Sequence, residues 1–301
     1  YEAAVAGGIP IIKAMRESFA ANKFYAIYGI LNGTCNYILT QMRETGQDFP
    51  DVLKKAQELG YAESDPTFDI EGIDAAHKLC LLTSLAFGVY PDFNALKVTG
   101  ISQINATDIK FVNEFGYCIK LLGIARKKDN EIVQKLEPCL VPINTPIGMI
   151  EDVFNAVYIK GDFVQAPMLI GAGAGEGPTA SSVVSDIIDL ARGNFVPTFG
   201  IPVAKLKQAN WADLGQLKSR YYLRLMVIDN PGVIAEIAEI LCDNNISIQS
   251  MRQSARNPQQ SVPIVLITHE TENKNIQNAT KAIEALECCS EKPCVIRIEE
   301  L

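Results

Sequence analysis

Apolar residues recur at helical spacing over long segments of the chain, and short β-branched or aromatic runs separate these segments. Up to about residue 193 the pattern predicts helices and strands in mixed order. The expected helices cover residues 11–21, 34–44, 49–59, 72–87, 106–116 and 179–192, and the expected strands cover 24–30, 117–127, 132–140 and 156–159. Short turns join several strands, so we predict an α+β fold with an open mixed β-sheet and helices on one face.

The pattern becomes more regular after residue 220. Strands are expected at residues 220–228, 246–252, 263–268 and 295–299, and helices at 233–243 and 275–286. This βαββαβ order predicts a ferredoxin-like domain. The predicted divisions are a first domain at 1–168, a glycine loop and helix at 169–193, a linker at 194–219 and the βαββαβ domain at 220–301.

The predicted helix 72–87 is apolar almost all the way round and nevertheless carries an acid and a lysine. Asp74 and Lys78 are one helical turn apart, and Leu81 and Leu85 continue their stripe. Only His77 and Ser84 are left for a solvent-facing stripe. A surface ion pair, worth roughly 0.2–0.5 kcal/mol, is the simplest alternative. Charges held against apolar surroundings cluster at functional sites, so the pattern favours a functional pair.

Composition narrows the class of protein. The net charge of −8 offers no basic field for nucleic acid or an anionic membrane. No apolar run approaches the roughly 20 residues that span a bilayer. The eight cysteines form no Cys-x-x-Cys, and two histidines supply no zinc-type cluster. We therefore expect a cytoplasmic protein with reduced thiols and small-molecule partners, without nucleic acid or membrane.

The segment between residues 56 and 78 carries a motif with fixed spacings: Ala56, Gly60-Tyr61-Ala62, Asp65-Pro66, Asp69-Ile70, Gly72, Asp74 and Lys78. This motif resembles the signature of homoserine dehydrogenases, and so many fixed positions make it a specific signal. Three further segments resemble the same family: residues 1–12, 29–39 and the glycine-rich 171–180. The resemblance extends from Tyr1 to about Arg192.

The resemblance implies hydride transfer between a nicotinamide cofactor and aspartate semialdehyde, which gives homoserine in amino-acid biosynthesis. Lys78 is then the acid and base near the reacting oxygen, because a buried lysine readily loses its proton. Asp74 and Asp69 are expected to hold substrate and to set the charge state of the lysine. Glu63 is expected to bind the substrate ammonium.

Cofactor contacts are expected at two turns. The resemblance assigns them to Asn32, Gly33, Thr34, Gly175 and Thr179. The glycine loop is not the dinucleotide fingerprint, because Glu176 or Pro178 occupies its last place. Close packing of the following helix on the sheet competes evenly with cofactor contact there. The choice between NADP and NAD stays open.

The first turn of the chain resembles the family's site for a monovalent cation such as sodium. One carboxylate and several backbone carbonyls supply the oxygen ligands that hard cations prefer. The expected ligands are Glu2, Val5, Gly7 and Ile9.

Several residues of the motif also have a simple structural interpretation. Asp65 before Pro66 is expected to form a turn, and Glu71 to be an acid in the first turn of a helix. Asp69 is a possible helix cap, as is Thr34. His77 is expected to face solvent or a neighbouring side chain and to bind no ligand.

The βαββαβ domain, with Asp229-Asn230-Pro231-Gly232-Val233 at its first turn, resembles an ACT domain. The resemblance implies an effector site at Asn230, Gly232 and Val233, with threonine as the effector and pairing of the modules. We expect a homodimer or homotetramer.

The chain begins at Tyr1, and we expect an upstream nucleotide-binding half that is missing from it. The isolated chain is then expected to be inactive. The competing hypothesis is that this chain is only an amino-acid-sensing, dimerising module without turnover of its own.

Overall fold

The computed structural model describes residues 1–253 and 261–301, and these residues form two compact units. The first unit contains residues 1–109, 119–138 and 143–212. The second contains residues 110–118, 139–142 and 213–301.

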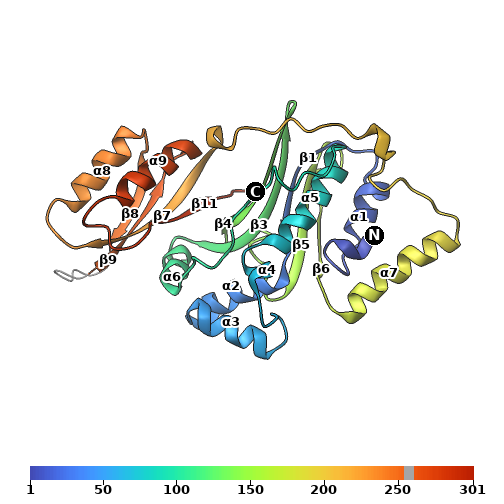
Figure 1. The fold of residues 1–301 in the computed structure, drawn as a ribbon, viewed down its shortest axis with the longest axis horizontal. Coiled ribbons are helices and arrows are strands. Elements are labelled where there is room, and N and C mark those ends of the chain that lie inside the picture. Colours follow the sequence, from blue (N-terminus) through green and yellow to red (C-terminus); the bar gives the residue numbers. More distant parts are fainter. Residues whose placement is uncertain (254–260) are drawn as a thin grey trace. The chain divides into compact units, whose positions relative to one another are not determined.

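A mixed β-sheet forms the frame of the first unit (Figure 1). Its strands lie in the order β6-β5-β1-β3-β4, and β2 pairs in parallel with β4 while β1 and β6 pair antiparallel with their neighbours. The strands are β1 (Phe24–Ile30), β2 (Lys97–Val98), β3 (Tyr117–Lys128), β4 (Glu131–Pro142), β5 (Phe154–Gly161) and β6 (Met168–Ala172). The predicted open mixed sheet is confirmed.

Two helices contact this sheet directly: α2 (Gly33–Thr45) packs on β5 and α5 (Ile73–Phe87) packs on β1. The unit also contains α1 (Ile11–Lys13), α3 (Phe49–Glu58), α4 (Thr67–Ile70) and α7 (Glu176–Ala191), with a π-helical turn η2 (Ala14–Ser18) after α1 and short 3₁₀ turns η1 (Glu2–Ala4) and η3 (Val203–Lys205). The residues of α6 (Ala106–Glu114) are divided between the two units. The predicted helix 11–21 is therefore shorter and irregular. Residues 193–217 are largely without regular secondary structure.

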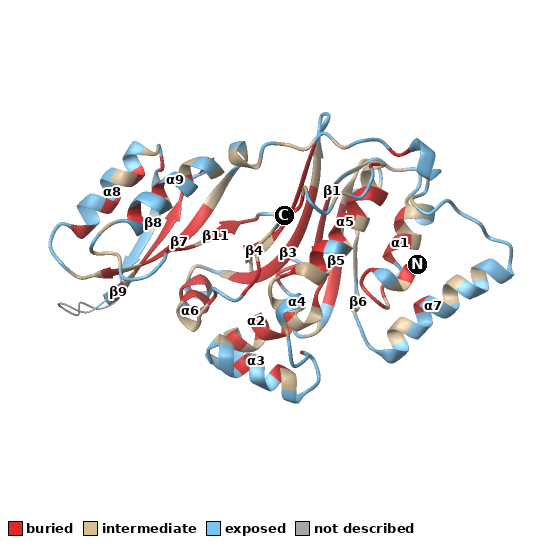
Figure 2. Cartoon of the chain, viewed as in Figure 1, coloured by how far each residue is buried: buried red, intermediate tan, exposed pale blue. Residues whose placement is uncertain are grey.

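Helix α5 packs against the centre of the sheet, where the strands are almost entirely buried (Figure 2). Leu79 and Leu82 on α5 are fully buried, as is Leu31 after β1. A Cβ on Gly123 of β3 would lie 3.2 Å from the side chains of both Leu31 and Leu79. Each fully buried leucine stabilises the fold by about 1.5–3 kcal/mol. This core fixes α5 relative to the end of β1.

The structure corrects several predictions about single residues of this unit. Ser84 is 1% exposed and donates its hydroxyl to the Cys80 carbonyl at 3.1 Å, so His77 alone faces outward on α5. Glu71 lies before the first residue of α5 and is not in its first turn. Helix α7 begins at Glu176, three residues earlier than predicted, because Pro178 is tolerated in a first turn.

The second unit has the predicted βαββαβ order. Its elements are β7 (Lys218–Ile228), α8 (Val233–Asp243), β8 (Ile248–Gln253), β9 (Ser261–Thr268), α9 (Asn273–Glu284) and β11 (Cys294–Ile298), with a short β10 (Thr271–Glu272) and a 3₁₀ turn η4 (Leu214–Gln216). The strand order is β11-β7-β9-β8, and all of these pairs are antiparallel.

The core of the second unit lies between this sheet and its two helices. Leu223 and Leu225 of β7 pack with Ile237 of α8 and Ile276 of α9. Ile234 of α8, by contrast, is 42% exposed. Within the described residues, no helix combines the length and apolar character needed to cross a membrane.

Candidate functional site

The acid and the lysine of α5 form a sheltered ion pair. Lys78 Nζ lies 2.6 Å from Asp74 Oδ2, and the two side chains are 19% and 24% exposed, respectively. The lysine also donates to the Leu31 carbonyl, at 3.1 Å, at the end of β1. Neither head group is out in bulk water. The surface-pair interpretation therefore does not describe this pair.

A glycine sets the start of α5 and so the place of Asp74. Gly72 is the residue before the helix, with φ 80°, and a Cβ there would lie 2.5 Å from a methyl group of Leu136. Only glycine adopts this conformation without strain at so close an approach. The position of Asp74 in the first turn of α5 follows from it, and Asp69 is not the cap.

Asn32 joins Asp74 to a second carboxylate. Its Nδ2 lies 2.7 Å from Asp69 Oδ1 and 3.0 Å from Asp74 Oδ2. Its Oδ1 accepts the backbone N–H of Cys35 at 2.9 Å, which makes Asn32 the cap of α2. The expectation that Thr34 caps this helix is wrong, since the Thr34 hydroxyl donates to the Tyr61 carbonyl at 2.6 Å.

Asp69 lies in a setting that disfavours its charge. Burial raises the pKa of its carboxyl, the hydrogen bond from Asn32 opposes this, and the charges of Asp74 and Glu63 raise it further. The Lys78 charge lowers the same pKa. Glu63 itself is exposed and lies on the loop after α3, close enough for its charge to act on Asp69. Of the four residues predicted for catalysis and substrate binding, Asp69, Asp74 and Lys78 therefore gather at one place, and the exposed Glu63 acts on Asp69 through its charge.

This cluster can bind an amino acid and move a proton. An ammonium group has three donors, and Lys78 uses two of them on Asp74 and Leu31. One N–H is therefore left over within the described part of the chain. The carboxylates of Glu63 and Asp69 are suitable partners for a substrate ammonium or hydroxyl.

Other residues of the motif have structural roles. Asp65 Oδ1 accepts both the backbone N–H and the hydroxyl of Thr67, and these bonds lower its pKa, as expected of a turn former. His77 stacks on Phe93, with ring centroids 4.2 Å apart, and also on Phe68. Its predicted position beside a neighbouring side chain is confirmed.

Gly33 lies against the backbone at the start of β5. A Cβ on Gly33 would lie 2.6 Å from the Val153 carbonyl oxygen. Gly33 thus lets α2 approach the sheet, and the turn at residues 32–34 is closely packed.

The first turn of the chain packs against the glycine loop. A Cβ on Gly7 would lie 2.4 Å from the Gly173 carbonyl oxygen, and the Gly8 N–H donates to Ala172 at 3.0 Å. Ser182 of α7 donates its hydroxyl to the Gly7 carbonyl at 2.7 Å. The predicted cation turn and one predicted cofactor loop therefore lie together.

Glu2 is 4% exposed, and its two oxygens accept the backbone N–H groups of Ile12 and Lys13, each at 2.8 Å. Burial raises the pKa of this carboxyl, and the two backbone hydrogen bonds oppose the rise. The carbonyl-bearing residues Val5 and Ile9 are buried in the same turn. No cluster of three or more His, Cys, Asp or Glu side chains suited to a metal occurs in residues 1–253 and 261–301.

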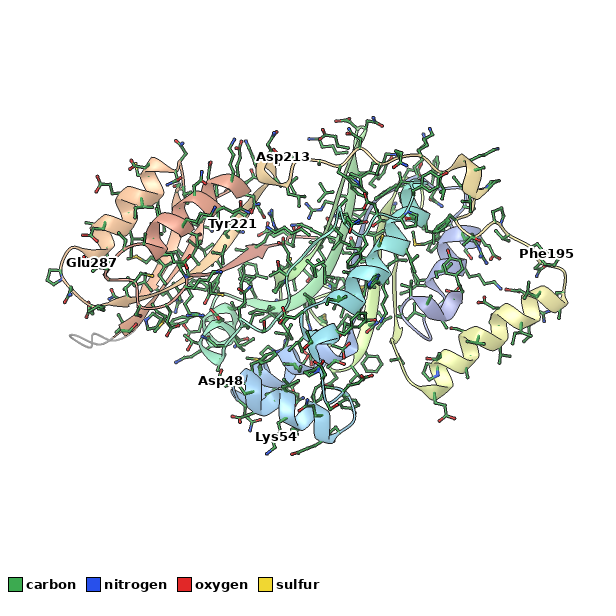
Figure 3. All side chains as sticks on the ribbon, viewed as in Figure 1. Asp48, Lys54, Phe195, Asp213, Tyr221 and Glu287 are labelled. Carbon is green, nitrogen blue, oxygen red and sulfur yellow. The ribbon has the colours of Figure 1, made fainter. Side chains whose placement is uncertain are left out.

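The N-terminus of α7 is open at the glycine loop. Gly175, the residue before the helix, is exposed and has φ 115°, which favours glycine. Thr179 is half-buried, and its N–H donates to the Gly175 carbonyl at 3.0 Å. The helix itself exposes much of its apolar surface, as does Phe195 beyond it (Figure 3), which is 76% exposed.

Sequence reasoning missed Asn155, a buried residue of β5 beneath the glycine loop. It is 1% exposed, and among the described residues neither its Oδ1 nor its Nδ2 has a hydrogen-bond partner. Its amide would lie about 2.1 Å from a Cβ on Gly173. Asparagine is depleted in strands, so its place in the run Phe154-Asn155-Ala156-Val157 was the available signal.

The second unit contains a pocket of about 240 Å³ at the turn between β7 and α8. Asn230, Gly232 and Val233, the predicted effector residues, all line it. The pocket is smaller than the roughly 300–1,000 Å³ typical of sites for drug-sized ligands, and its size suits a single small molecule.

Comparison with known proteins gives consistent matches over the whole chain. Residues 10–188 match the family model described as homoserine dehydrogenase, and residues 221–288 match the ACT domain model. A homoserine dehydrogenase of Neisseria gonorrhoeae is 46% identical over 307 residues, and the alignment covers 100% of this chain and 71% of that protein.

Solved structures of homoserine dehydrogenases also match this chain. The crystal structure of a homoserine dehydrogenase from Thiobacillus denitrificans is 46% identical with a TM-score of 0.92, and the match covers 100% of this chain and 70% of that chain. A hyperthermophilic archaeal homoserine dehydrogenase in complex with NADPH is 29% identical with a TM-score of 0.54, over 64% of this chain and 55% of that chain.

Proposed function

Because the chain belongs to the homoserine dehydrogenase family of NAD(P)-dependent oxidoreductases and carries an ACT regulatory domain, we propose that Lys78, Asp74 and Asp69 catalyse its reaction. The reaction is the interconversion of L-homoserine and L-aspartate 4-semialdehyde in the biosynthesis of threonine, methionine and isoleucine. The observation that carries this proposal is the sheltered pair of Lys78 and Asp74 beside Asp69.

Lys78 handles the proton of the reacting oxygen. When bound, NAD(P) supplies or accepts the hydride at the adjacent carbon. The Nζ of Lys78 donates a proton to the oxygen during reduction and removes it during oxidation. Asp74 and the Leu31 carbonyl hold Nζ in place, while Asp69 and Glu63 bind the amino-acid end of the substrate.

The glycine loop fits part of a nucleotide cofactor. Free N–H groups at the first turn of α7 attract anionic groups, and Gly175 leaves them uncovered. The amide of Asn155, which has no hydrogen-bond partner among residues 1–253 and 261–301, fits a polar ligand group near Gly173. We assign Gly175 and Thr179 to this cofactor contact and keep Asn32, Gly33 and Thr34 as a second predicted contact.

Most of the cofactor, as NADP or NAD, is expected to be bound by a nucleotide-binding part outside these 301 residues. This expectation stays a prediction, which the sequence upstream of Tyr1 tests. The domain divisions at residues 168, 193 and 219, and a cytoplasmic location, also stay predictions.

A monovalent cation such as sodium is proposed at the turn of Glu2, Val5, Gly7 and Ile9. The turn offers a carboxylate and backbone carbonyl oxygens as ligands. Two consecutive residues of the turn have a left-handed backbone conformation, Ala6 at φ 56° and Gly7 at φ 50°. Sodium should raise the thermal midpoint in a saturable manner, and a Glu2→Gln variant should lose the increase. A midpoint that follows ionic strength alone argues against this site.

Threonine is the proposed effector, bound in the pocket at Asn230, Gly232 and Val233, and the protein is proposed to be a homodimer or homotetramer. The start of α8, where backbone N–H groups and the helix dipole favour negative charge, suits the carboxylate of an amino acid. Calorimetry with threonine should show saturable binding that an Ile234→Trp variant at the pocket weakens. Equal threonine binding by the wild type and the Ile234→Trp variant would contradict an effector site in this pocket.

A second candidate function is an amino-acid-sensing, dimerising module without turnover, and the pocket of the second unit favours it. NADP-linked oxidation of homoserine, followed at 340 nm, separates the two. Turnover by a version of the protein as long as its relatives, greatly reduced by Lys78→Met, supports the enzyme. Threonine binding with no turnover, in this chain and in a version as long as its relatives, supports the sensing module.

A further inference from the structure

We propose that Asn32 is a positioning residue of this site: its side-chain amide holds Asp69 and Asp74 in one geometry, and Asp74 in turn fixes the Lys78 ammonium. This inference rests on the proposed function, because it assigns a role within the same site. It gives the Asn32 side chain a use beyond the predicted contact with nicotinamide.

The orientation of the Asn32 amide is determined by its surroundings. The side chain is buried at 6% exposure, and its Oδ1 accepts the Cys35 N–H as the cap of α2. Its NH₂ group therefore points the other way, toward Asp69 and Asp74. A flipped amide would lose the cap and would put an oxygen between two carboxylates, so the helix start selects a single orientation.

The two carboxylates need a shared donor. Both oxygens lie within hydrogen-bond distance of the same nitrogen, so they are less than about 6 Å apart. Like charges at this separation repel, and burial adds to the cost of ionising both. The two N–H groups of Asn32 supply one hydrogen bond to each carboxylate. Asparagine achieves this without adding a positive charge that would compete with Lys78.

The end of β1 thus holds both members of the catalytic pair. The Leu31 carbonyl accepts from Lys78 Nζ, and the next side chain, Asn32, donates to Asp74. Leu31 is fully buried, which fixes the backbone at this point. Because Asp74 Oδ2 bonds both Asn32 and Lys78, loss of the amide would free the carboxylate to turn and carry the lysine with it.

The decisive variant is Asn32→Asp. Aspartate caps a helix as well as asparagine does, so the bond to Cys35 and the start of α2 are kept. Only the NH₂ donor is lost, and an oxygen takes its place beside Asp69 and Asp74. The charged groups that act on the Asp69 carboxyl are Asp74 and Lys78 on α5 and Glu63 on the loop after α3, and Asp69, Asp74 and Glu71 all act on the Cys35 thiol of α2.

A matched control is Asn22→Asp. The Oδ1 of Asn22 accepts the Val164 N–H at 2.7 Å and its Nδ2 donates to the Phe19 carbonyl at 3.1 Å. The change there also keeps an acceptor, removes a donor and adds a charge, but no residue of the cluster contacts it. We expect Asn22→Asp to have wild-type kcat and an unchanged pH profile.

The kinetic assays use a version of the protein as long as its relatives. For Asn32→Asp we expect kcat to fall roughly ten- to a hundredfold, as for a small misplacement of a catalytic group. The acidic limb of the pH profile should move to higher pH. Carboxyl ¹³C shifts of Asp69, followed against pH in the protein without cofactor, should show protonation at higher pH than in the wild type. Serine can cap the helix but cannot reach the carboxylates. The Asn32→Ser variant should therefore also have a lower kcat, although it adds no negative charge.

Wild-type kcat and wild-type Asp69 titration in Asn32→Asp would overturn the inference and leave Asn32 as a cap alone. If Asn32→Asp does not fold, Asn32→Ser decides in the same way. Failure of the proposed function is separate: it appears as absent turnover in a wild-type version as long as the relatives, while the carboxyl titration still tests the role of Asn32.

Discussion

Replacing Lys78 with methionine removes the amine and keeps most of the apolar side chain. The cost in unfolding free energy lies between that of losing an exposed ion pair and that of leaving a buried charge unpaired. The pair is 2.6 Å long and about four-fifths buried, so its loss costs more than the roughly 0–1 kcal/mol of an exposed pair. Asp74 keeps its bond from Asn32 and some solvent contact, so the cost stays below the roughly 3–5 kcal/mol of a stranded buried charge. We expect a loss of about 1–2 kcal/mol in unfolding free energy.

The effect on turnover should be larger. General acid–base catalysis contributes roughly 10²–10⁴-fold, which equals about 3–5 kcal/mol of activation free energy. In a version of the protein as long as its relatives, Lys78→Met should therefore lower kcat by that factor in the NADP-linked assay, while urea unfolding shows a folded protein. Lys78→Arg is the matched control, because it keeps the charge but cannot act as a base near neutral pH. It should be nearly as inactive and more stable than the methionine variant.

A kcat for Lys78→Met within about twofold of the wild type would refute the assignment, since no transition-state interaction would then have been removed. If the methionine variant is inactive because it is completely unfolded, the predicted loss in unfolding free energy is refuted instead. Circular dichroism distinguishes the two cases.

Two further predictions concern stability. Burial raises the folded-state pKa of Asp69 above its ordinary 3.8, so its contribution to stability is fully present below the unfolded pKa and is lost as pH rises through the folded pKa. The Asp69→Asn variant has no titrating carboxyl at this position and so does not lose this stability. The unfolding free energy of the variant minus that of the wild type should therefore increase with pH above about 4 in urea titrations. A difference that does not change with pH would contradict the assigned shift. Gly33→Ala should cost about 1–3 kcal/mol, because its Cβ would lie 2.6 Å from the Val153 carbonyl, whereas Gly177→Ala, with open space around it, should be neutral or stabilising. Equal stabilities of the two variants would show that the backbone near Gly33 gives way.

The sequence was informative wherever one local rule decided the structure. The strand Phe24–Ile30 and the helix Val233–Asp243 have the predicted bounds, since β-branched runs and helical periodicity are local signals. The stripe of Asp74 and Lys78 beside Leu81 and Leu85 likewise predicted a sheltered pair. The turn at Asp65 followed from the side-chain chemistry of aspartate before proline.

Long-range contacts account for the rest. Ser84 is polar, and the packing of α5 in the fold buries it while its hydroxyl donates to the Cys80 carbonyl. The partners of Asn32 are 37 and 42 residues away, so its bridge between two carboxylates could not be read from local spacing. Asn155 lies under Gly173 because β5 and β6 pair, and this pairing is not visible in either segment alone.

The most direct test of the central claim is a crystal structure of the protein with L-homoserine bound. The account predicts the homoserine hydroxyl within about 2.6–3.2 Å of Lys78 Nζ, with the ammonium group beside Glu63 or Asp69. Homoserine bound away from Lys78, or a Lys78 side chain turned away from the bound ligand, would contradict it.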